Sequence, residues 1–274
     1  MDYNINEFHN RLLEIMKQVH KLCVDNNIQY TLIGGSLIGA IRHKGFIPWD
    51  DDMDVGMTWE NYTKFLLIIK SYRHEWLEFD YPNSRRDYYQ AFIKAYDSRT
   101  TFVEEQHSLK QARGIFIDIM PFSNAGSNLQ QACWNFKFHK FLLAFYRRKG
   151  YDLGKSRIKE YSFGLVGKLF SNRFWNFLIS KHYEYLNAKK SVFVSDMDGS
   201  IKGIVKTDLF QNYKLVKFED CSLMVICRYD EYLSQVFGNY MQLPPLEAQI
   251  PHHITYLNLA ESYKEYVKRL SNNL

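Results

Sequence analysis

The stretch from Gly34 to Gly56 decides the fold, and it reads GGSLIGAIRHKGFIPWDDDMDVG. An apolar run ends at two glycines, and the residues that follow favour a short helix over Ser36–Arg42. A strand that turns through glycines into a helix exposes backbone N–H groups with the positive end of the helix dipole behind them, which suits a phosphate. We therefore expect the N–H groups of Gly35 and Ser36 to bind an anion.

Three carboxylates in apolar surroundings follow this turn. Asp52 and Asp54 lie in or beside the predicted strand Met53–Met57, where residues two apart point to the same side. Close carboxylates stay ionised most readily around a cation, and hard oxygen ligands favour Mg²⁺ or Mn²⁺ held jointly with substrate phosphates. Asp118 lies inside a second apolar strand, Gly114–Ile119, where an acid is costly unless it is paired or binds metal. We expect the three to form a metal site.

Each of these features also has a purely structural explanation. The glycine turn could be an ordinary turn, Asp50–Asp52 could be an exposed acidic loop, and Asp118 could form a buried salt bridge with Arg113. The joint order of the three features is harder to explain in this way. The dinucleotide-binding fingerprint lacks its second glycine, and the nucleophile-elbow pattern fails because Ile38 occupies its last position.

The remaining patterns predict an α+β fold. The apolar spacing favours a first helix that starts at Asn4 with a capping box to Glu7, and a later helix capped by Thr58. Strands are expected before residue 120, and helices from Leu129 to Lys190. We divide the chain into a catalytic core (1–125), a basic, aromatic helical segment (126–206) and a C-terminal segment packed on the core (207–274). The expected strands are Ile28–Ile33, Met53–Met57, Trp76–Tyr81, Gln90–Tyr96, Thr101–Glu105 and Gly114–Ile119.

The composition is that of a globular enzyme-sized chain. Of 274 residues, 46% are hydrophobic and 24% charged, which excludes a disordered chain. No apolar run is long enough to span a bilayer, and the start lacks the order of a signal peptide. Four cysteines are too few and too scattered for a disulfide framework. We expect a cytoplasmic protein. Peripheral association with the inner face of the plasma membrane is the alternative localisation.

The net charge of +5 is concentrated in one segment. Residues 137–190 carry 13 Lys or Arg and 3 Asp or Glu. Helical spacing joins a set of large apolar residues there, namely Trp134, Phe138, Phe141, Leu142 and Phe145. The favoured interpretation is a stripe that faces the core and a solvated basic back. The alternative is docking of residues 134–190 on an anionic membrane or lipid-linked glycan. Recognition motifs for nucleic acid are absent, so we expect no nucleic-acid partner, and a non-catalytic nucleic-acid-binding protein is the weakest interpretation.

Several motifs resemble the LicD family, which lies in the nucleotidyltransferase-fold superfamily together with the fukutin-type enzymes. The resemblance is closest at Ile41–Asp54, and it covers most of the chain outside Leu129–Lys206. Two positions depart from the family pattern. The family usually has an acid where Asn239 stands, and it commonly has a proline near the position of Cys227. The other matching segments are Lys94–Thr101, Gly114–Pro121, Phe218–Asp220, Tyr229–Leu233, Phe237–Met241 with Pro244-Pro245, and His252 or His253.

The resemblance implies a nucleotidyltransferase-like mixed sheet with flanking helices, and a transferase that uses a divalent metal. Its donor would be a CDP-alcohol, its product CMP, and its acceptor a hydroxyl of a cell-surface glycan or lipid-linked glycan, such as lipopolysaccharide or teichoic acid. The group transferred would be phosphocholine or a polyol phosphate. Nucleotidyl transfer from a nucleoside triphosphate, with release of pyrophosphate, is the alternative on the same fold.

Residue roles follow as expectations from this reaction. Asp118 would take the proton of the acceptor hydroxyl. Arg42, His43 and Lys44 would steady the phosphates, or merely balance the neighbouring acids. The other donor-binding candidates are Gly35 and Ser36 for a phosphate oxygen, Lys94, and Trp49 or Phe46 against a quaternary ammonium, with a core anchor as the simpler role of Trp49.

Overall fold

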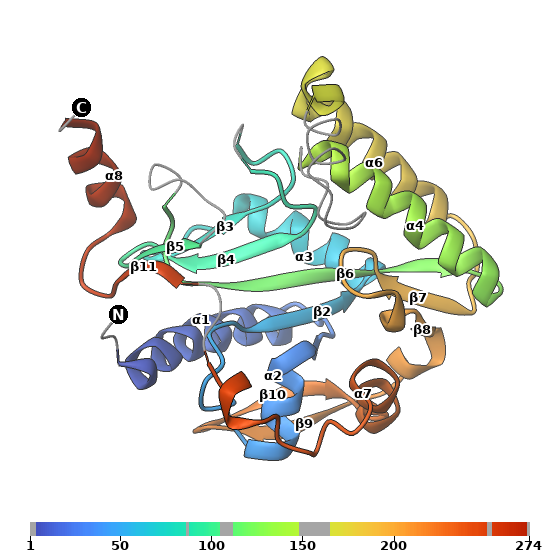
Figure 1. Ribbon diagram of the computed structural model, residues 1–274, viewed down its shortest axis with the longest axis horizontal. Helices are drawn as coiled ribbons and strands as arrows, with labels where there is room; N and C mark the ends of the chain where they lie inside the picture. The colour runs from blue at the N-terminus through green and yellow to red at the C-terminus, as the bar shows by residue number, and fades with distance from the viewer. Residues whose placement is uncertain (1–3, 86–87, 105–111, 148–164, 251–253, 273–274) are drawn as a thin grey trace.

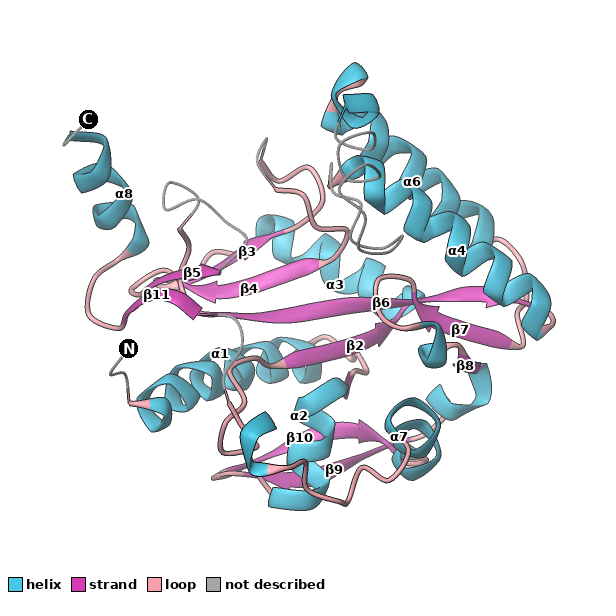
Figure 2. Cartoon of the chain, in the orientation of Figure 1, coloured by secondary structure: helices cyan, strands magenta, loops and turns pink. Residues whose placement is uncertain are grey.

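A mixed β-sheet runs through the middle of the molecule, with helices packed against it (Figure 1). The computed structural model describes residues 4–85, 88–104, 112–147, 165–250 and 254–272. Helices and strands follow one another without the regular alternation of a doubly wound fold, and both are well represented (Figure 2). The predicted α+β class is confirmed.

The central sheet contains seven strands within the described residues. They are β1 (Thr31–Leu32), β2 (Asp54–Thr58), β3 (Leu77–Asp80), β4 (Ile93–Asp97), β6 (Phe116–Gly126), β7 (Phe193–Asp196) and β8 (Val205–Lys206). Five of them follow the order β1-β2-β6-β4-β3, while β7 pairs with β6 and β8 pairs with β7. Strands β2 and β6 are parallel, and the other neighbours are antiparallel.

Strand β6 extends well past its predicted end at Ile119. Pro121 and Gly126 give its second half the composition of a turn, but this half pairs with β2 and β7. The first predicted strand, Ile28–Ile33, is shorter than expected because only Thr31 and Leu32 pair with β2. The other predicted strand ends lie within three residues of the observed ones, and the predicted start at Thr101 coincides with the observed start. Strand β6 is thus the centre of the sheet, with β2 and β4 on its two sides.

The two predicted helix caps are right in position and wrong in detail. Helix α1 (Ile5–Asp25) begins after Asn4, whose side chain accepts a hydrogen bond from the backbone N–H of Asn6 at 3.0 Å. Glu7 does not close a capping box with the cap backbone, because its carboxylate bonds to the Asn4 side chain at 3.4 Å. Helix α3 (Trp59–Ser71) begins after Thr58, whose hydroxyl makes no cap bond and accepts from Asn61.

Two hydrophobic clusters form most of the core. The larger one combines α1, the central sheet and residues 209–240. The second lies under α4 (Leu129–Tyr146) and α6 (Asn172–Asn187), which pack side by side (Figure 1). The other elements are β5 (Thr101–Glu104), β9 (Tyr213–Phe218), β10 (Cys221–Ile226), α7 (Tyr229–Phe237), β11 (Ile254–Asn258) and α8 (Tyr263–Asn272). The division of the chain at residues 125 and 206 stays a prediction.

The apolar stripe of α4 is divided between solvent and core, so the favoured interpretation of a stripe facing the core is wrong for three of its five members. Leu142 is buried, and Phe145 is half-buried and stacks on Trp175 at 4.7 Å between ring centroids. Trp134 is 70% exposed, and Phe138 and Phe141 are exposed as well. The face of α4 turned toward the sheet instead carries smaller and mixed residues, Ala132, Phe136, His139 and Leu143. Periodicity identifies an apolar face, and it does not reveal which side of the helix the rest of the protein covers.

The basic side chains that accompany the stripe are also only partly exposed to solvent. Lys140 Nζ lies 3.6 Å from a carboxylate oxygen of Asp198, and Arg147 forms a second, closer ion pair with the same carboxylate. These contacts lower the pKa of Asp198 against the opposing effect of its burial. Two of the bases therefore tie α4 to the loop after β7. Arg148 and Lys149 lie outside the described residues.

A buried histidine pair joins α4 and α6. His139 Nδ1 and His182 Nδ1 lie 3.0 Å apart. Burial lowers the pKa of His139 to about 3 and that of His182 to about 4. His182 lowers the pKa of His139 further, as do Arg147 and Lys140, while Asp198 raises it. Both rings are therefore neutral in the folded protein at pH 7.

We expect the free energy of unfolding to fall as the pH drops below about 6.5. Both histidines titrate near their ordinary pKa in the unfolded chain and at a lower pKa in the folded one. The unfolded state then binds more protons, and stability that is fully present above pH 6.5 is lost toward pH 4. At pH 5 the loss is roughly 2 kcal/mol for each histidine. Urea unfolding at pH 7.5 and 5.0 measures it. A His139→Asn/His182→Gln variant should lose less between these pH values, and an equal loss would contradict the assignment.

Candidate functional site

Asp54, Asp118 and Lys94 form one row across the centre of the sheet. Asp54 of β2 lies opposite Asp118 of β6 in the parallel pairing, and Asp118 lies opposite Lys94 of β4 in the antiparallel pairing. Residues opposite one another in a sheet point to the same face. The structure thus brings together two of the three predicted metal ligands and one predicted donor-binding residue.

Lys94 is the ion-pair partner of Asp118. Its Nζ lies 3.2 Å from Asp118 Oδ1, and both side chains are largely buried. The same ammonium stands 3.2 Å from the centre of the Phe116 ring. The alternative partner considered from the sequence, Arg113, lies 3.5 Å from Asp80 instead. The lysine therefore supplies positive charge that makes a carboxylate tolerable inside this strand.

The glycine turn packs directly against the carboxylates. Ser36 Oγ accepts a hydrogen bond from the backbone N–H of Asp54 at 2.9 Å. A Cβ atom on Gly35 would lie 2.5 Å from Asp50 Oδ2, and one on Gly34, whose φ is +57°, would lie 3.1 Å from Asp54 Oδ2. Gly34 to Ser36 form the first turn of α2 (Gly34–Ile38), where N–H groups have no acceptor within the helix. The predicted anion-binding turn and the acids are parts of one site.

The acids of this site act on one another electrostatically. The pKa of Asp54 is raised well above its usual range, first by burial and then by the negative charges of Asp52, Asp118 and Asp50. A cation among these carboxylates would relieve both effects, because it compensates the charge that burial and the neighbouring acids disfavour.

The residues present fit a magnesium-type ion that is bound together with phosphate. Among the residues that the structure describes, no three His, Cys, Asp or Glu side chains are gathered closely enough to enclose a metal by themselves. Mg²⁺ is commonly bound by one or two carboxylates plus substrate phosphates, so it does not need such an enclosure. Asp52, Asp54 and Asp118 supply only oxygen donors, the class that Mg²⁺ and Mn²⁺ prefer.

Two members of the basic trio after the glycine turn donate hydrogen bonds to backbone oxygens. Arg42 Nη1 donates to the carbonyl oxygens of Tyr240, at 2.7 Å, and Gln242, at 3.2 Å. Lys44 Nζ donates to the carbonyl oxygen of Ile41 at 2.9 Å. The pKa of His43 is lowered by burial and by the adjacent Arg42. Arg42 and Lys44 thus bond to backbone oxygens, and the predicted role of the trio toward phosphate stays a prediction.

Of the two aromatic candidates for a quaternary ammonium, Phe46 is enclosed. Its ring is buried and stacks on His9 at 4.3 Å between centroids, with Phe218 edge-on at 4.9 Å. Trp49 is half-buried and has the His43 ring edge-on at 6.4 Å. Trp49 is therefore the better placed of the two to offer an aromatic face to a ligand.

The loop after Arg42 is held by contacts that sequence reasoning did not predict. Glu219 lies in the turn between β9 and β10, and its Oε1 accepts from the backbone N–H of Phe46 at 3.0 Å. The backbone N–H of Glu219 donates to the carbonyl oxygen of Lys44 at 2.8 Å. His9 Nε2 lies 2.7 Å from the carbonyl oxygen of Asp50 in the same loop. The resemblance at Phe218–Asp220 marked the first of these positions, but nothing in the sequence marked His9.

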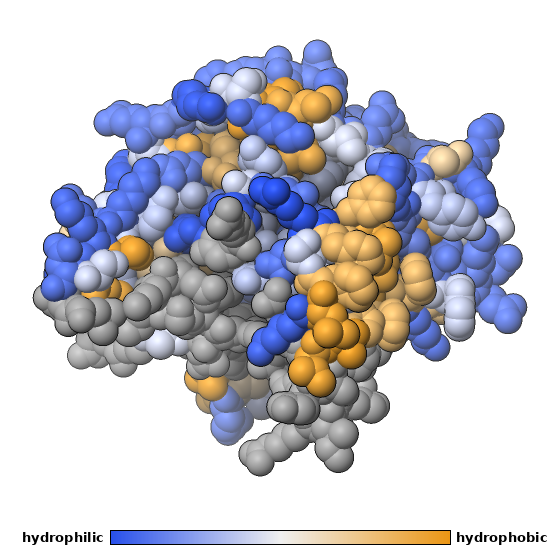
Figure 3. Space-filling view, turned by 90° about the horizontal axis from the view of Figure 1, so that it is seen from above, coloured by the Kyte–Doolittle hydropathy of each residue, from blue (hydrophilic) through white to orange (hydrophobic). Residues whose placement is uncertain are grey.

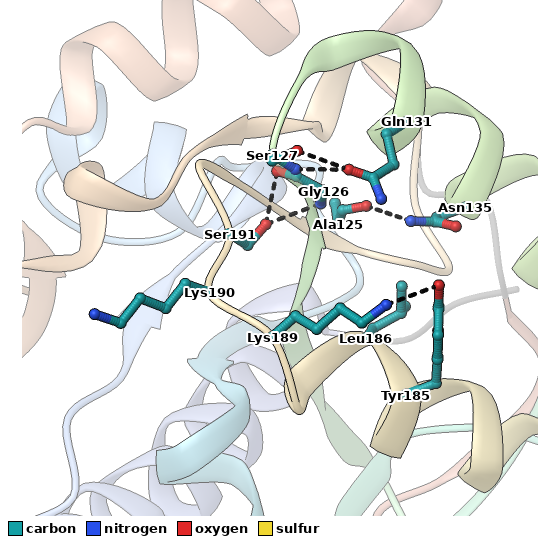
Figure 4. A pocket seen from close by; sticks show the side chains of 10 residues that line it. All are labelled: Ala125, Gly126, Ser127, Gln131, Asn135, Tyr185, Leu186, Lys189, Lys190 and Ser191. Atoms are coloured by element: carbon teal, nitrogen blue, oxygen red, sulfur yellow. Dashed lines mark hydrogen bonds between the residues drawn. The ribbon is translucent and has the colours of Figure 1, made fainter.

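A small pocket lies at the far end of β6, away from the carboxylates (Figure 4). Its polar groups bond to one another: Ser191 Oγ lies 2.8 Å from both the N and O atoms of Gly126, and Asn135 donates to the carbonyl oxygen of Ala125 at 2.7 Å. These bonds join β6 to the starts of α4 and β7. We therefore assign a structural role to this region.

The tight turn after α2 should tolerate no side chain at Gly39. Gly39 begins η1 (Gly39–His43), a π-helical turn, and a Cβ there would lie 2.5 Å from the carbonyl oxygen of Gly45. We expect Gly39→Ala to lower the free energy of unfolding by about 1–3 kcal/mol, measured by urea denaturation. Gly203→Ala is the matched control, because a Cβ there meets no atom within 4 Å, and its effect should stay within about 0.5 kcal/mol. Equal denaturation midpoints would refute this packing.

Comparison with known proteins places the chain in a family. The profile described as LicD/FKTN/FKRP, nucleotidyltransferase domain, matches residues 27–155, which include the turn, the acids and Lys94. The lipopolysaccharide cholinephosphotransferase LicD of Haemophilus influenzae is 30% identical over 254 residues, which cover 88% of this chain and 93% of that protein. An uncharacterized protein of Rickettsia typhi is 42% identical over 62 residues, 23% of this chain and 20% of its own length. This chain therefore belongs to the LicD family.

Proposed function

We propose that the protein transfers phosphocholine, or a related alcohol phosphate, from a CDP-linked donor to a hydroxyl of a cell-surface glycan and releases CMP. The observation that carries the proposal is the placement of Asp54, which lies opposite Asp118 in the sheet and also packs against the Gly34–Ser36 turn. Acids that bind a divalent ion beside N–H groups that bind phosphate are the parts that pyrophosphate chemistry requires. The relative from Haemophilus influenzae, named as a cholinephosphotransferase, supports the class of group transferred.

Asp52, Asp54 and Asp118 would hold Mg²⁺ or Mn²⁺, which, when bound, offsets the negative charge of the phosphates. The N–H groups of Gly35 and Ser36 bind a phosphate oxygen of the donor. Asp118 accepts the proton of the acceptor hydroxyl, whose oxygen bonds to the phosphorus distal to the nucleoside. The bond from this phosphorus to the bridging oxygen breaks, and the electron pair leaves with CMP.

Lys94 and Trp49 complete the proposed site. Lys94 fixes the Asp118 carboxylate through the 3.2 Å ion pair, and its ammonium also adds positive charge beside the donor phosphates. Trp49 offers an aromatic face to the quaternary ammonium of a choline head group, for which cation–π contact is a common mode of recognition.

The test identifies the released product. The protein is incubated with Mg²⁺ and CDP-choline, CDP-ethanolamine, CDP-ribitol or CDP-glycerol, with and without lipopolysaccharide or teichoic acid, and nucleotide release is followed by chromatography. We expect CMP, formed faster with the right acceptor. The Leu67→Ala variant changes an exposed residue of α3. It is purified and assayed in the same way and should release CMP at the rate of the unmodified protein.

A second function is nucleotidyl transfer, in which a hydroxyl attacks the α-phosphorus of a nucleoside triphosphate and pyrophosphate leaves. The description of the matching profile as a nucleotidyltransferase domain favours it. Incubation with the four nucleoside triphosphates separates the two functions. Release of pyrophosphate without CMP from any CDP-alcohol would replace the first proposal by the second, and release of neither product would contradict both.

A further inference from the structure

The outer face of α4 and α6 carries large apolar side chains that are exposed to solvent. Trp134 is 70% exposed, Phe177 is 55% exposed, and Phe138 and Phe174 are exposed to a smaller extent. Seen from above, side chains over these helices form an apolar area with hydrophilic side chains beside it (Figure 3). Monomeric proteins rarely expose a contiguous apolar surface unless it has a binding role.

The two helices present these side chains on the same side. The residues of α6 that pack inward are Trp175, Ile179, His182 and Leu186, so Phe174 and Phe177 lie on the opposite face of the helix. In α4 the inward residues leave Trp134 and Phe138 on the outer face in the same way. The ring of Phe138 stands edge-on to His182 at 5.1 Å, and Phe170 stacks on Phe174 at 4.5 Å. Phe138 of α4 therefore contacts α6, and the exposed rings of the two helices lie on neighbouring elements.

Positive charge surrounds this surface. Of the described residues from 137 to 190, eight are Lys or Arg and one, Glu184, is acidic. Lys140 and Arg147 are bound to Asp198, which leaves six exposed bases, namely Lys137, Lys168, Arg173, Lys181, Lys189 and Lys190. Glu184 itself pairs with Lys181 at 2.6 Å.

We propose that the outer face of α4 and α6 docks on an anionic phospholipid bilayer. Exposed Trp and Phe on one face of a helix, with Lys and Arg at the margins, are suited to the boundary between head groups and acyl chains. The bases add attraction to anionic lipid. A second copy of the chain would cover the apolar side chains less favourably, because a two-fold interface sets the same positive surface against itself. None of the helices in the described part of the chain is both long and apolar enough to cross a membrane, so the proposed docking takes place at the surface of the bilayer.

Vesicle sedimentation tests the proposal with the full chain and without any substrate, so its failure is distinct from a failure of the transfer reaction. We expect the protein to sediment with phosphatidylcholine vesicles that contain about 30% phosphatidylglycerol and to stay largely in the supernatant with pure phosphatidylcholine. Raising the salt concentration should weaken binding, since the charges lie at the surface. Equal sedimentation with both kinds of vesicle, or none with either, would overturn the proposal.

Matched variants locate the surface. Trp134→Ala/Phe177→Ala should weaken binding to anionic vesicles by about tenfold or more, and Lys137→Glu/Arg173→Glu should weaken it as well. Leu67→Ala/Leu246→Ala removes similarly exposed apolar side chains elsewhere and should bind as the unmodified protein does. Circular dichroism checks that each variant is folded. If sedimentation velocity shows a dimer that the aromatic variant abolishes while vesicle binding is unchanged, the face binds a second copy and not a bilayer.

Discussion

Replacing Asp54 with Asn should lower the rate of CMP release by about 10³-fold or more, as expected when the groups that position charge at a reacting phosphorus are lost. Asn keeps the shape of the side chain and removes its charge. Asp54 connects the carboxylates to the glycine turn. It lies opposite Asp118 in the sheet, and its backbone N–H donates a hydrogen bond to Ser36 Oγ. The measurement is turnover with saturating donor and Mg²⁺.

The same variant should remain folded, which makes the loss of activity interpretable. Burial and the neighbouring acids raise the pKa of Asp54, so its ionised form disfavours folding at pH 7. Removing the charge should therefore leave the melting temperature unchanged or higher. Mg²⁺ should raise the melting temperature of the unmodified protein more than that of Asp54→Asn, because only a ligand that binds the folded state stabilises it. Near-normal turnover by the folded variant would sink the assignment of Asp54.

The sequence allowed the site to be predicted where its parts are local. The turn at Gly34–Ser36 and the acids at Asp52 and Asp54 lie within one short stretch. Asp54 begins β2, whereas Asp52 precedes that strand, so the strand period accounts for the position of Asp54 alone. Asp118 could be predicted because an acid inside an apolar strand is rare. That Asp118 lies beside Asp54 follows from the parallel pairing of β2 with β6, and sequence spacing does not specify this pairing.

Contacts between distant segments could not be predicted in this way. The partner of Asp118 depends on the register of β4 against β6, and that register brings Lys94 within reach while Arg113 lies beside Asp80. Glu219 and Arg42 link the loop to the C-terminal part of the chain over more than 170 residues. The direction of the α4 stripe depends on which face the rest of the chain covers.

The ion pair between Lys94 and Asp118 leads to the second large effect. Replacing Lys94 with Met should lower the melting temperature by about 5–10 °C in the absence of divalent ions, since it leaves a largely buried carboxylate without its lysine partner. Met fills a similar volume, so the loss is one of charge. Lys217→Met, at an exposed position of β9, is the control and should change the melting temperature little.

A double-mutant cycle separates this charge effect from packing. Adding Asp118→Asn to Lys94→Met should recover part of the lost stability, because the carboxylate that lost its lysine partner is then gone. Mg²⁺ should stabilise the Lys94→Met protein more than the unmodified one, because the ion then meets a carboxylate without a competing ammonium. In the Asp118→Asn background this difference should vanish. If Lys94→Met costs as much stability in that background as in the unmodified protein, the lysine acts through its packing on Phe116 and the ion pair contributes nothing.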